Sequence, residues 1–379
     1  MKQFVFCLLM LFSSTFGIGL FLNYSYEVTS DSLTPSEKEL LKRTILDVKY
    51  RYRGKEKEKL PLQVNLGKQL FHDQGLSRNK NISCSSCHVP EHNFQDVNNL
   101  SEQVNGSPIR ALSLRGVAEQ DWYFWDGRAD SLWAQALDAL VKDHDLSTKE
   151  VVKYVCDTYE LQYASLLSHC GKTKYSEQQA VEVGKAIGSY VSTITHYWTR
   201  FDEYVYRRFI EAEESVDVLT NDELAGMRLF FNSEKTGCID CHSGPRFTNG
   251  DFFAIGTGRK EQHDRIAGGK KYQDSIYQCQ NWQEPEYCDH AQYARFEGSD
   301  LKGAFKVPSL RNLAGSPSFM HDGRFKSLEE VIDFYINPYE YPLIHTDVTP
   351  LRLLPHQREQ LILFLQALND EYIPPSNSK

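Results

Sequence analysis

A mainly α-helical fold of two related domains is predicted by three features of the sequence. Apolar residues recur at helical spacing in several segments, whereas no segment of useful length alternates apolar and polar residues as a strand would. A short module occurs twice along the chain. The 379 residues are also enough for about two domains, at roughly 150 residues each.

The helical spacing is clear in four segments: 178–201, 221–231, 327–335 and 355–368. Ser327 is followed by two glutamates, and Asp130 or Ser131 stands directly ahead of Leu132. Both patterns are typical of helix starts. The acidic stretch 211–222 is interpreted as an interdomain linker. We therefore expect an N-terminal domain over residues 36–212 and a C-terminal domain over residues 213–372.

Residues 1–26 are predicted to direct export. Lys2 precedes an apolar run from Phe4 to Leu22, which suits a secretory signal peptide or an uncleaved membrane anchor. We favour the signal peptide, because the run is barely long enough to span a bilayer. In either case the rest of the chain leaves the cytoplasm. The net charge of −9 argues against binding to nucleic acid or to an anionic membrane surface.

Two Cys-x-x-Cys-His runs carry the chemistry: Cys84-Ser85-Ser86-Cys87-His88 and Cys238-Ile239-Asp240-Cys241-His242. Two cysteines at this spacing form thioethers to the vinyl groups of one haem, and the adjacent histidine binds the iron. A zinc site would need further ligand pairs, and the sequence has none at zinc spacing. We therefore expect two covalently bound haem c groups, each within one cytochrome c-like helical domain.

The repeated module extends well beyond the haem motifs. Gly67-x-x-Leu70-Phe71 and Gly226-x-x-Leu229-Phe230 precede the two motifs. Downstream, Ser113-Leu114-Arg115 and Asp126-Gly127-Arg128 recur 196 residues later as Ser309-Leu310-Arg311 and Asp322-Gly323-Arg324. Two blocks that keep one separation indicate a duplicated module. The second copy carries an extra polar stretch around 256–303, which we expect to form a surface loop.

Four cysteines lie outside the leader and the haem motifs. Cys156 with Cys170, and Cys279 with Cys288, are close in sequence within polar segments. Two local disulfides in an oxidising compartment are expected, and free buried thiols are the alternative.

Each iron has one further axial position once His88 and His242 are bound. Methionine is the usual sixth ligand of an electron-transfer cytochrome. Of the four methionines, Met1 and Met10 lie in the leader and Met227 precedes its haem motif on the same helix. Met320 is the serious methionine candidate.

From Gly67 to about Leu368 the chain resembles the bacterial dihaem cytochrome c peroxidase and MauG superfamily. The matching stretches are 66–71, Phe124-Trp125-Asp126-Gly127-Arg128, Cys-His-Ser-Gly-Pro at 241–245, 306–312 and Met320-His321-Asp322-Gly323. The resemblance implies a periplasmic, peroxidase-type oxidoreductase that takes hydrogen peroxide. Its electron donor would be a protein substrate or a small electron-transfer protein.

The resemblance also implies the ligands of the second haem. The position fourteen residues after His321 holds a methionine in the peroxidase branch and an iron-binding tyrosine in the MauG branch, and here it is Tyr335. A core tyrosine with Met320 on the iron is the alternative. Carried back by 196 residues, Tyr335 corresponds to Ala139, which cannot bind a metal. The only histidine in the loop before Trp125 is His92, close to His88 in sequence, so we expect an open first haem.

Catalytic residues are implied at three further positions. Gln135 matches the family's distal glutamine, and Asp145 stands where the family has glutamate, with His144 or Asp143 as alternatives. Asp145 in a solvated turn is the plainer interpretation. Trp125 matches the tryptophan that lies between the two haems and relays an electron hole, although a purely packed tryptophan is also compatible.

Two arginines and a metal complete the predicted site. Arg115 and Arg311 are expected to pair with haem propionates, or else to form ordinary salt bridges. The family's calcium site between the haems uses an asparagine that falls at Arg110 here, and its second segment is Ser316-Pro317-Ser318. Calcium binding is therefore left open.

The sequence as a whole favours a MauG-like enzyme that uses hydrogen peroxide to oxidise a protein or another redox donor. A cytochrome c peroxidase that removes peroxide is the main alternative. A dihaem electron carrier without enzymatic activity would need two six-coordinate irons, which Ala139 argues against.

Overall fold

The computed structural model of the chain describes residues 33–47, 61–97, 109–167, 170, 174–257, 264–282, 288–338 and 346–369. The predicted export leader, residues 1–26, lies outside this part of the chain. Within the described ranges, no helix combines the length and the apolar character that a membrane span requires.

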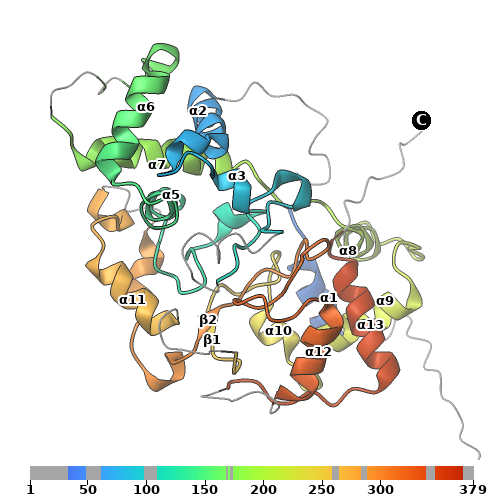
Figure 1. Cartoon of the computed structure of the whole chain (residues 1–379). Coiled ribbons are helices and arrows are strands. Elements are labelled where there is room, and N and C mark those ends of the chain that lie inside the picture. The colour runs from blue at the N-terminus through green and yellow to red at the C-terminus, as the bar shows by residue number, and fades with distance from the viewer. Residues whose placement is uncertain are drawn as a thin grey trace, which may run out of the picture.

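The predicted mainly α-helical fold is confirmed (Figure 1). Within the described residues, the α-helices of more than one turn are α1 (Pro35–Lys42), α2 (Leu62–His72), α5 (Leu132–Lys142), α6 (Thr148–Tyr163), α7 (Glu177–Val191), α8 (Arg200–Val205), α9 (Asn221–Phe231), α11 (Arg265–Asp274), α12 (Leu328–Ile336) and α13 (Pro355–Gln366). The one-turn helices α3 (Cys84–Cys87) and α10 (Cys238–Cys241) carry the cysteine motifs. The strands β1 (Phe252–Phe253) and β2 (Phe305–Lys306) pair antiparallel.

Three predicted helical segments are confirmed. The segment 221–231 is α9, 327–335 corresponds to α12, and 355–368 corresponds to α13. Ser327 caps α12, since its hydroxyl accepts the backbone N–H of Glu330 at 3.2 Å. Ser131 caps α5 in the same way. Both serines therefore satisfy an N–H group that the first helical turn leaves without a partner.

The predicted helix over residues 178–201 is wrong in its second half. Helix α7 ends at Val191 and α8 begins at Arg200. Beyond α7, the Thr193 hydroxyl donates to the Tyr190 carbonyl at 2.7 Å. Thr199 then starts α8, where its backbone N–H donates to the Asp202 carboxylate at 2.9 Å. These side chains compete with the helical hydrogen bonds, and apolar spacing does not register that competition.

Each half of the chain crosses two helices at a glycine. Gly67 of α2 lies against α7, where a Cβ atom would be 1.8 Å from the Ala186 carbonyl oxygen. Gly226 of α9 lies against α13, where a Cβ atom would be 1.8 Å from the Gln360 carbonyl oxygen. Only glycine permits backbones to approach this closely. The duplicated module therefore packs its first helix in the same way twice.

The described chain has two large, separate apolar cores. The first contains buried residues from Val64 to Ile194, contributed mainly by α2, α5, α6 and α7. The second combines residues 33–46 with residues 198–368, so that α1 and α8 pack with α9 and α13 (Figure 1). The division at residues 212 and 213 stays a prediction. The buried cores themselves divide between Ile194 and Trp198.

The extra stretch of the second module is more than the predicted surface loop. It contains α11, and Arg265 at the start of that helix is buried. Arg265 Nη1 donates to the Gly127 carbonyl at 2.8 Å. Its guanidinium also lies 3.9 Å from the ring of Phe252 and 4.4 Å from that of Trp122. The stretch is therefore anchored on the first half of the chain by a buried cation between aromatic rings.

Candidate active site

The first Cys-x-x-Cys-His run forms one helical turn that ends at its histidine. The His88 backbone N–H donates to the Cys84 carbonyl at 2.9 Å. The His88 imidazole Nδ1 lies 3.2 Å from the Phe94 carbonyl oxygen, so Nδ1 carries the proton and Nε2 is the nitrogen available to a metal. Burial lowers the pKa of His88. A neutral, oriented imidazole is what iron ligation requires.

The second run repeats this geometry. The His242 backbone N–H donates to the Cys238 carbonyl at 2.9 Å, and His242 Nδ1 lies 3.0 Å from the Phe247 carbonyl oxygen. Burial lowers the pKa of His242 to about 4. The four motif cysteines are free thiols, whereas the other cysteines of the described chain are paired. The donor set therefore fits two haem groups held by thioethers and axial histidines.

The turns after the Ser-Leu-Arg blocks also match between the halves. Phe124 and Met320 both adopt left-handed backbone, with φ of 65° and 66°, and so do Gly127 and Gly323, with φ of 66° and 67°. Both turns are closed by an isolated antiparallel bridge. The separation of 196 residues in the sequence thus corresponds to one backbone geometry built twice. Trp125 and His321 are equivalent positions within it.

These two equivalent side chains meet where the halves join. Trp125 is 6 % exposed, and its ring centroid lies 6.3 Å from that of His321 in an edge-to-face arrangement. The Trp125 indole N–H donates to the Arg110 carbonyl at 2.9 Å. The Arg110 N–H donates to the His321 carbonyl at 2.8 Å, and the Lys306 N–H donates to the Trp125 carbonyl at 2.8 Å. Trp125 is therefore fixed between the two modules.

Tyr335 and Met320, the two candidate ligands of the second haem, belong to one apolar cluster. Both pack against buried Phe319, Phe325 and Phe334. Burial raises the pKa of the Tyr335 hydroxyl, with smaller contributions from Cys238 and Cys241. The Tyr335 hydroxyl is thus within electrostatic range of the second haem motif. Ligation of iron by Tyr335 stays a prediction.

Helix α5 presents the predicted distal residues of the first haem. Gln135 and Ala139 are four residues apart and both half-buried, so they share one face of the helix. His92, the histidine of the preceding loop, is exposed. Helix α5 begins at Leu132 and α12 begins at Leu328, so Ala139 of the first module and Tyr335 of the second occupy the same position in their helices.

The three acid–base candidates after α5 lie in different surroundings. Asp145 is 81 % exposed and forms an ion pair of 3.4 Å with Arg78 at the surface. The His144 imidazole is buried, with Nδ1 2.6 Å from the Leu76 carbonyl oxygen. Asp143 caps the end of α5. Its charge raises the pKa of the Cys84 and Cys87 thiols, after the larger effects of burial and, at Cys87, of Asp96. Of the three, Asp143 is the carboxylate whose charge acts on the first haem motif.

Arg115 is held inside the first module. Its Nε donates to Asn93 Oδ1 at 2.9 Å and its Nη1 donates to the Thr195 carbonyl at 3.1 Å. The central guanidinium carbon also lies 3.8 Å from the centroid of the Tyr197 ring, and Nη2 donates a hydrogen bond to the Tyr197 hydroxyl. Its pairing with a haem propionate stays a prediction.

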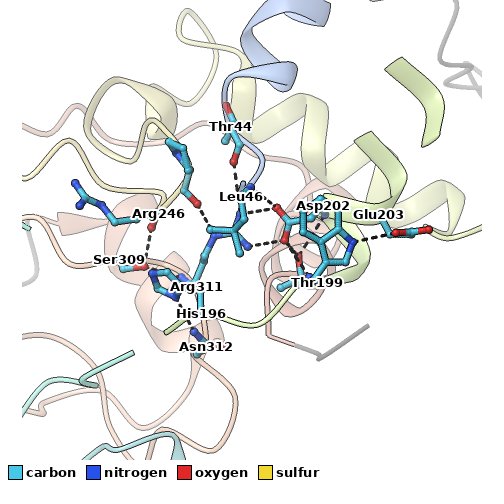
Figure 2. Close-up of polar contacts among 12 residues, drawn as sticks. Thr44, Leu46, His196, Thr199, Asp202, Glu203, Arg246, Ser309, Arg311 and Asn312 are labelled. Atoms are coloured by element: carbon cyan, nitrogen blue, oxygen red, sulfur yellow. Dashed lines mark hydrogen bonds and ion pairs between the residues drawn. The ribbon is translucent and has the colours of Figure 1, made fainter. Parts of the chain in front are cut away.

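Arg311, the equivalent residue of the second module, forms a fully buried ion pair (Figure 2). Its two terminal nitrogens donate to the Asp202 carboxylate at 2.7 and 2.8 Å, and both side chains are 0 % exposed. Asp202 also accepts the Leu46 backbone N–H at 3.0 Å. This network joins the segment after α1, helix α8 and the Ser-Leu-Arg block. A propionate partner for Arg311 remains a prediction beside these contacts.

The structure brings each predicted cysteine pair together. Cys156 is bonded to Cys170, with Cα atoms 5.4 Å apart, and Cys279 is bonded to Cys288, with Cα atoms 5.8 Å apart. The first pair links Cys156 within α6 to Cys170 beyond its end, and the second lies in the stretch that packs on the first module.

Several residues of this region were missed from the sequence. His321 could have been found, because the repeat aligns it with Trp125. Asp202 had a local signal as well, since Thr199-x-x-Asp202 is a capping sequence. His196, whose Nδ1 lies 3.1 Å from Asn312 Nδ2 (Figure 2), carried no signal of its buried position.

Comparison with known proteins places this geometry in context. Residues 61–208 match the family described as di-haem cytochrome c peroxidase. The methylamine utilization protein MauG of Methylorubrum extorquens is 30 % identical over 82 % of this chain and 79 % of that protein. The cytochrome-c peroxidase IdrP1 of Pseudomonas sp. strain SCT is 27 % identical over 81 % of this chain and 80 % of that protein.

A solved structure supports the same fold. The diheme peroxidase BthA of Burkholderia thailandensis superposes with a TM-score of 0.61 at 21 % identity. The match covers 88 % of this chain and 92 % of that one.

Proposed function

The chain belongs to the MauG and di-haem cytochrome c peroxidase family and is a dihaem peroxidase-type oxidoreductase, and we propose that its haem ligation is that of MauG. Its substrates are hydrogen peroxide and a redox partner protein. The bound haems supply the iron that takes peroxide and holds the oxidising equivalents. The residues of this chain decide which iron is open, where protons move and how the two sites communicate.

The free motif cysteines support covalent attachment of both haems. Cys84 and Cys87 would hold one haem with His88 on its iron, and Cys238 and Cys241 would hold the other with His242. The hydrogen bonds from both Nδ1 atoms to backbone carbonyls support this assignment, because they fix each imidazole and leave Nε2 for the metal.

One observation carries the MauG-like assignment. The position on α12 that corresponds to Ala139 of α5 holds Tyr335, whose hydroxyl lies within electrostatic range of Cys238 and Cys241. An alanine side chain offers no ligand, whereas a phenol does. We therefore assign Tyr335 as the second protein ligand at the second haem and leave the first haem open for peroxide.

Proton transfer at the open site requires a group on α5 or directly after it. Gln135 shares the face of Ala139 and would orient bound peroxide through its amide. Asp143 is the carboxylate we propose for moving the proton between the two peroxide oxygens, in place of Asp145. Its charge reaches the first motif, whereas the Asp145 carboxylate lies in solvent beside Arg78.

Trp125 would connect the two sites. Its buried indole is held between the modules by the Arg110 carbonyl and packs edge-on against His321. An indole fixed in this way can pass an electron hole between the two halves without moving.

Export to the periplasm agrees with the cysteine pattern. Two disulfides outside the haem motifs favour an oxidising compartment, and thioether attachment of haem would add to that preference. We propose that the predicted signal peptide directs this export, with a membrane anchor as the alternative.

Removal of peroxide with a small electron-transfer protein as donor is the second candidate function. The similarity to cytochrome-c peroxidases favours it. The two candidates differ in the oxidation state of the enzyme that reacts with peroxide. A MauG-like enzyme should react when fully oxidised, whereas a peroxidase whose first haem carries a removable distal ligand must first be half-reduced.

Stopped-flow spectroscopy of the fully oxidised protein tests the proposal. Addition of hydrogen peroxide without prior reduction should produce an immediate change in the haem absorption bands. A protein that stays unreactive until one haem is reduced would be a cytochrome c peroxidase with a closed first site, and the MauG-like assignment would be lost.

A further inference from the structure

Arg110 is a buried cation at the contact between the two modules. Its side chain and backbone are 9 % exposed in total. Nη1 donates to the Ser316 hydroxyl at 3.1 Å, and the backbone N–H donates to the His321 carbonyl at 2.8 Å. The Arg110 carbonyl accepts the Trp125 indole N–H at 2.9 Å. Arg110 of the first module thus donates two hydrogen bonds to the second module and accepts one from Trp125.

The guanidinium keeps its charge in this position. Burial lowers the pKa of Arg110 to about 10, while the buried Asp96 acts in the opposite direction. A group with that pKa is protonated at neutral pH. The interface beside Trp125 therefore contains a permanent positive charge that belongs to the chain itself.

This charge lies where the family resemblance implies calcium. The two segments of that site, Arg110 and residues 316–318, meet in the structure. Ser316 Oγ accepts from Arg110 and donates to the Ser318 carbonyl at 2.8 Å, so the Ser316 hydroxyl is engaged. The buried Ser318 hydroxyl has no hydrogen-bond partner among the described residues. The structure brings together the expected segments around a guanidinium.

Calcium does not fit these residues. The arginine side chain has five N–H donors and no acceptor, so the Arg110 guanidinium cannot ligate a cation. Calcium requires about six to eight oxygen ligands at roughly 2.3–2.6 Å, and it would be repelled by the adjacent guanidinium. Within the part of the chain that the structure describes, no group of three or more His, Cys, Asp or Glu side chains could hold a metal ion instead.

We propose that the Arg110 guanidinium replaces calcium as the cation that joins the two haem-binding halves beside Trp125, so that this protein neither binds nor needs calcium. Arg110 is then a positioning residue that acts through Trp125. The inference does not depend on whether Tyr335 or Met320 binds the second iron.

The wild-type holoprotein provides the first test. Elemental analysis after purification in calcium-containing buffer should give far less than one calcium per chain. A chelator or added calcium chloride should leave the Tm, the haem spectrum and the lifetime of the peroxide-oxidised protein unchanged. Stoichiometric calcium whose removal lowers the Tm would overturn the proposal.

Two variants of Arg110 provide the second test. Arg110→Asn restores an oxygen acceptor, whereas Arg110→Leu removes the cation without supplying one. Both should lower the Tm and shorten the lifetime of the peroxide-oxidised protein. Calcium should raise the Tm of Arg110→Asn by several degrees, as a ligand of the folded state does, and leave Arg110→Leu unchanged.

Equal responses of the two variants to calcium would show that the guanidinium does not occupy a cation position, and would overturn the proposal. If a variant fails to fold, the calcium content and the calcium response of the wild-type protein still decide whether the proposal holds. A wild-type protein indifferent to calcium but unreactive when fully oxidised would leave Arg110 assigned and remove only the MauG-like function.

Discussion

At the scale of single residues, the coordination of the second iron depends on which side chain reaches it. Tyr335 and Met320 pack against the same phenylalanines, so apolar contacts do not distinguish them. The family resemblance does, because it implies a ligand fourteen residues after His321, and the hydroxyl of Tyr335 at that position lies within electrostatic range of Cys238 and Cys241. The choice has a spectroscopic consequence.

Tyr335→Phe should change the absorption and magnetic spectra of the second haem and leave those of the first nearly intact. A phenolate stabilises ferric iron, so the reduction potential of the second haem should rise when the phenol is lost. Spectroelectrochemical titration measures this rise. Met320→Leu is the matched control, since its side chain lies in the same cluster. If Met320→Leu produces these changes and Tyr335→Phe does not, the methionine is the ligand.

The proposed acid–base residue can be tested against its exposed neighbour. Asp143→Asn should slow the reaction of the oxidised protein with peroxide by about 10²–10⁴-fold, the range usual for loss of a general acid–base group. Asp145→Asn should leave the rate near that of wild type, because that carboxylate pairs with Arg78 at the surface. Rapid mixing with peroxide measures both rates. A large loss in Asp145→Asn alone would restore the assignment made from the sequence.

The repeated geometry of the two Cys-x-x-Cys-His runs was predictable, because the same spacing occurs twice in the sequence. Tyr335 was proposed from the family resemblance and Ala139 from the repeat, and ligation by Tyr335 stays a prediction. Asp143 could not be chosen over Asp145 from the sequence. The choice depends on the left-handed backbone at Asp145, with φ of 57°, which turns the chain toward Arg78 at the surface.

At the scale of elements, two glycines determine how closely the helices of each half cross. Helical propensity alone would predict that alanine stabilises both α2 and α9, by roughly 1 kcal/mol relative to glycine. The carbonyl oxygens of Ala186 and Gln360 reverse that expectation, because they are backbone atoms that cannot move aside.

Gly67→Ala should therefore destabilise the protein by about 1–3 kcal/mol, the usual cost of overpacking. Gly188→Ala is the control, since a Cβ atom there would lie 3.2 Å from the Leu132 Cβ atom. Its gain in helical propensity should offset that contact and keep the change within about 1 kcal/mol. Denaturant unfolding of the two holoproteins gives both values. Similar losses in the two variants would mean that close backbone approach does not set the crossing.

Elements were predictable where a cap or a clear apolar stripe marks them, as for α9, α12 and α13. The helix expected over 178–201 failed because Thr193 and Thr199 bond the backbone locally. Helix α11 was missed because its contacts, through Arg265 to Gly127, lie far away in the sequence. Neither effect is visible in apolar periodicity.

At the scale of the whole molecule, duplication explains both the symmetry and its breakdown. The two modules share their haem motifs, their glycine crossings and their left-handed turns, and these matches were foreseeable from the repeated blocks. The second module differs by its extra stretch and by Tyr335 in the place of Ala139. The pairing of Trp125 with His321, and the role of Arg110 beside them, required the packing of one half on the other.

Electron paramagnetic resonance of the resting, fully oxidised holoprotein tests the central claim most directly, because it reports the coordination of both irons at once. The asymmetry between Ala139 and Tyr335 predicts one high-spin signal from the open haem at His88. It also predicts one low-spin signal from the haem at His242. Two low-spin signals would mean that both irons carry two axial protein ligands, which would contradict the open site and favour an electron carrier.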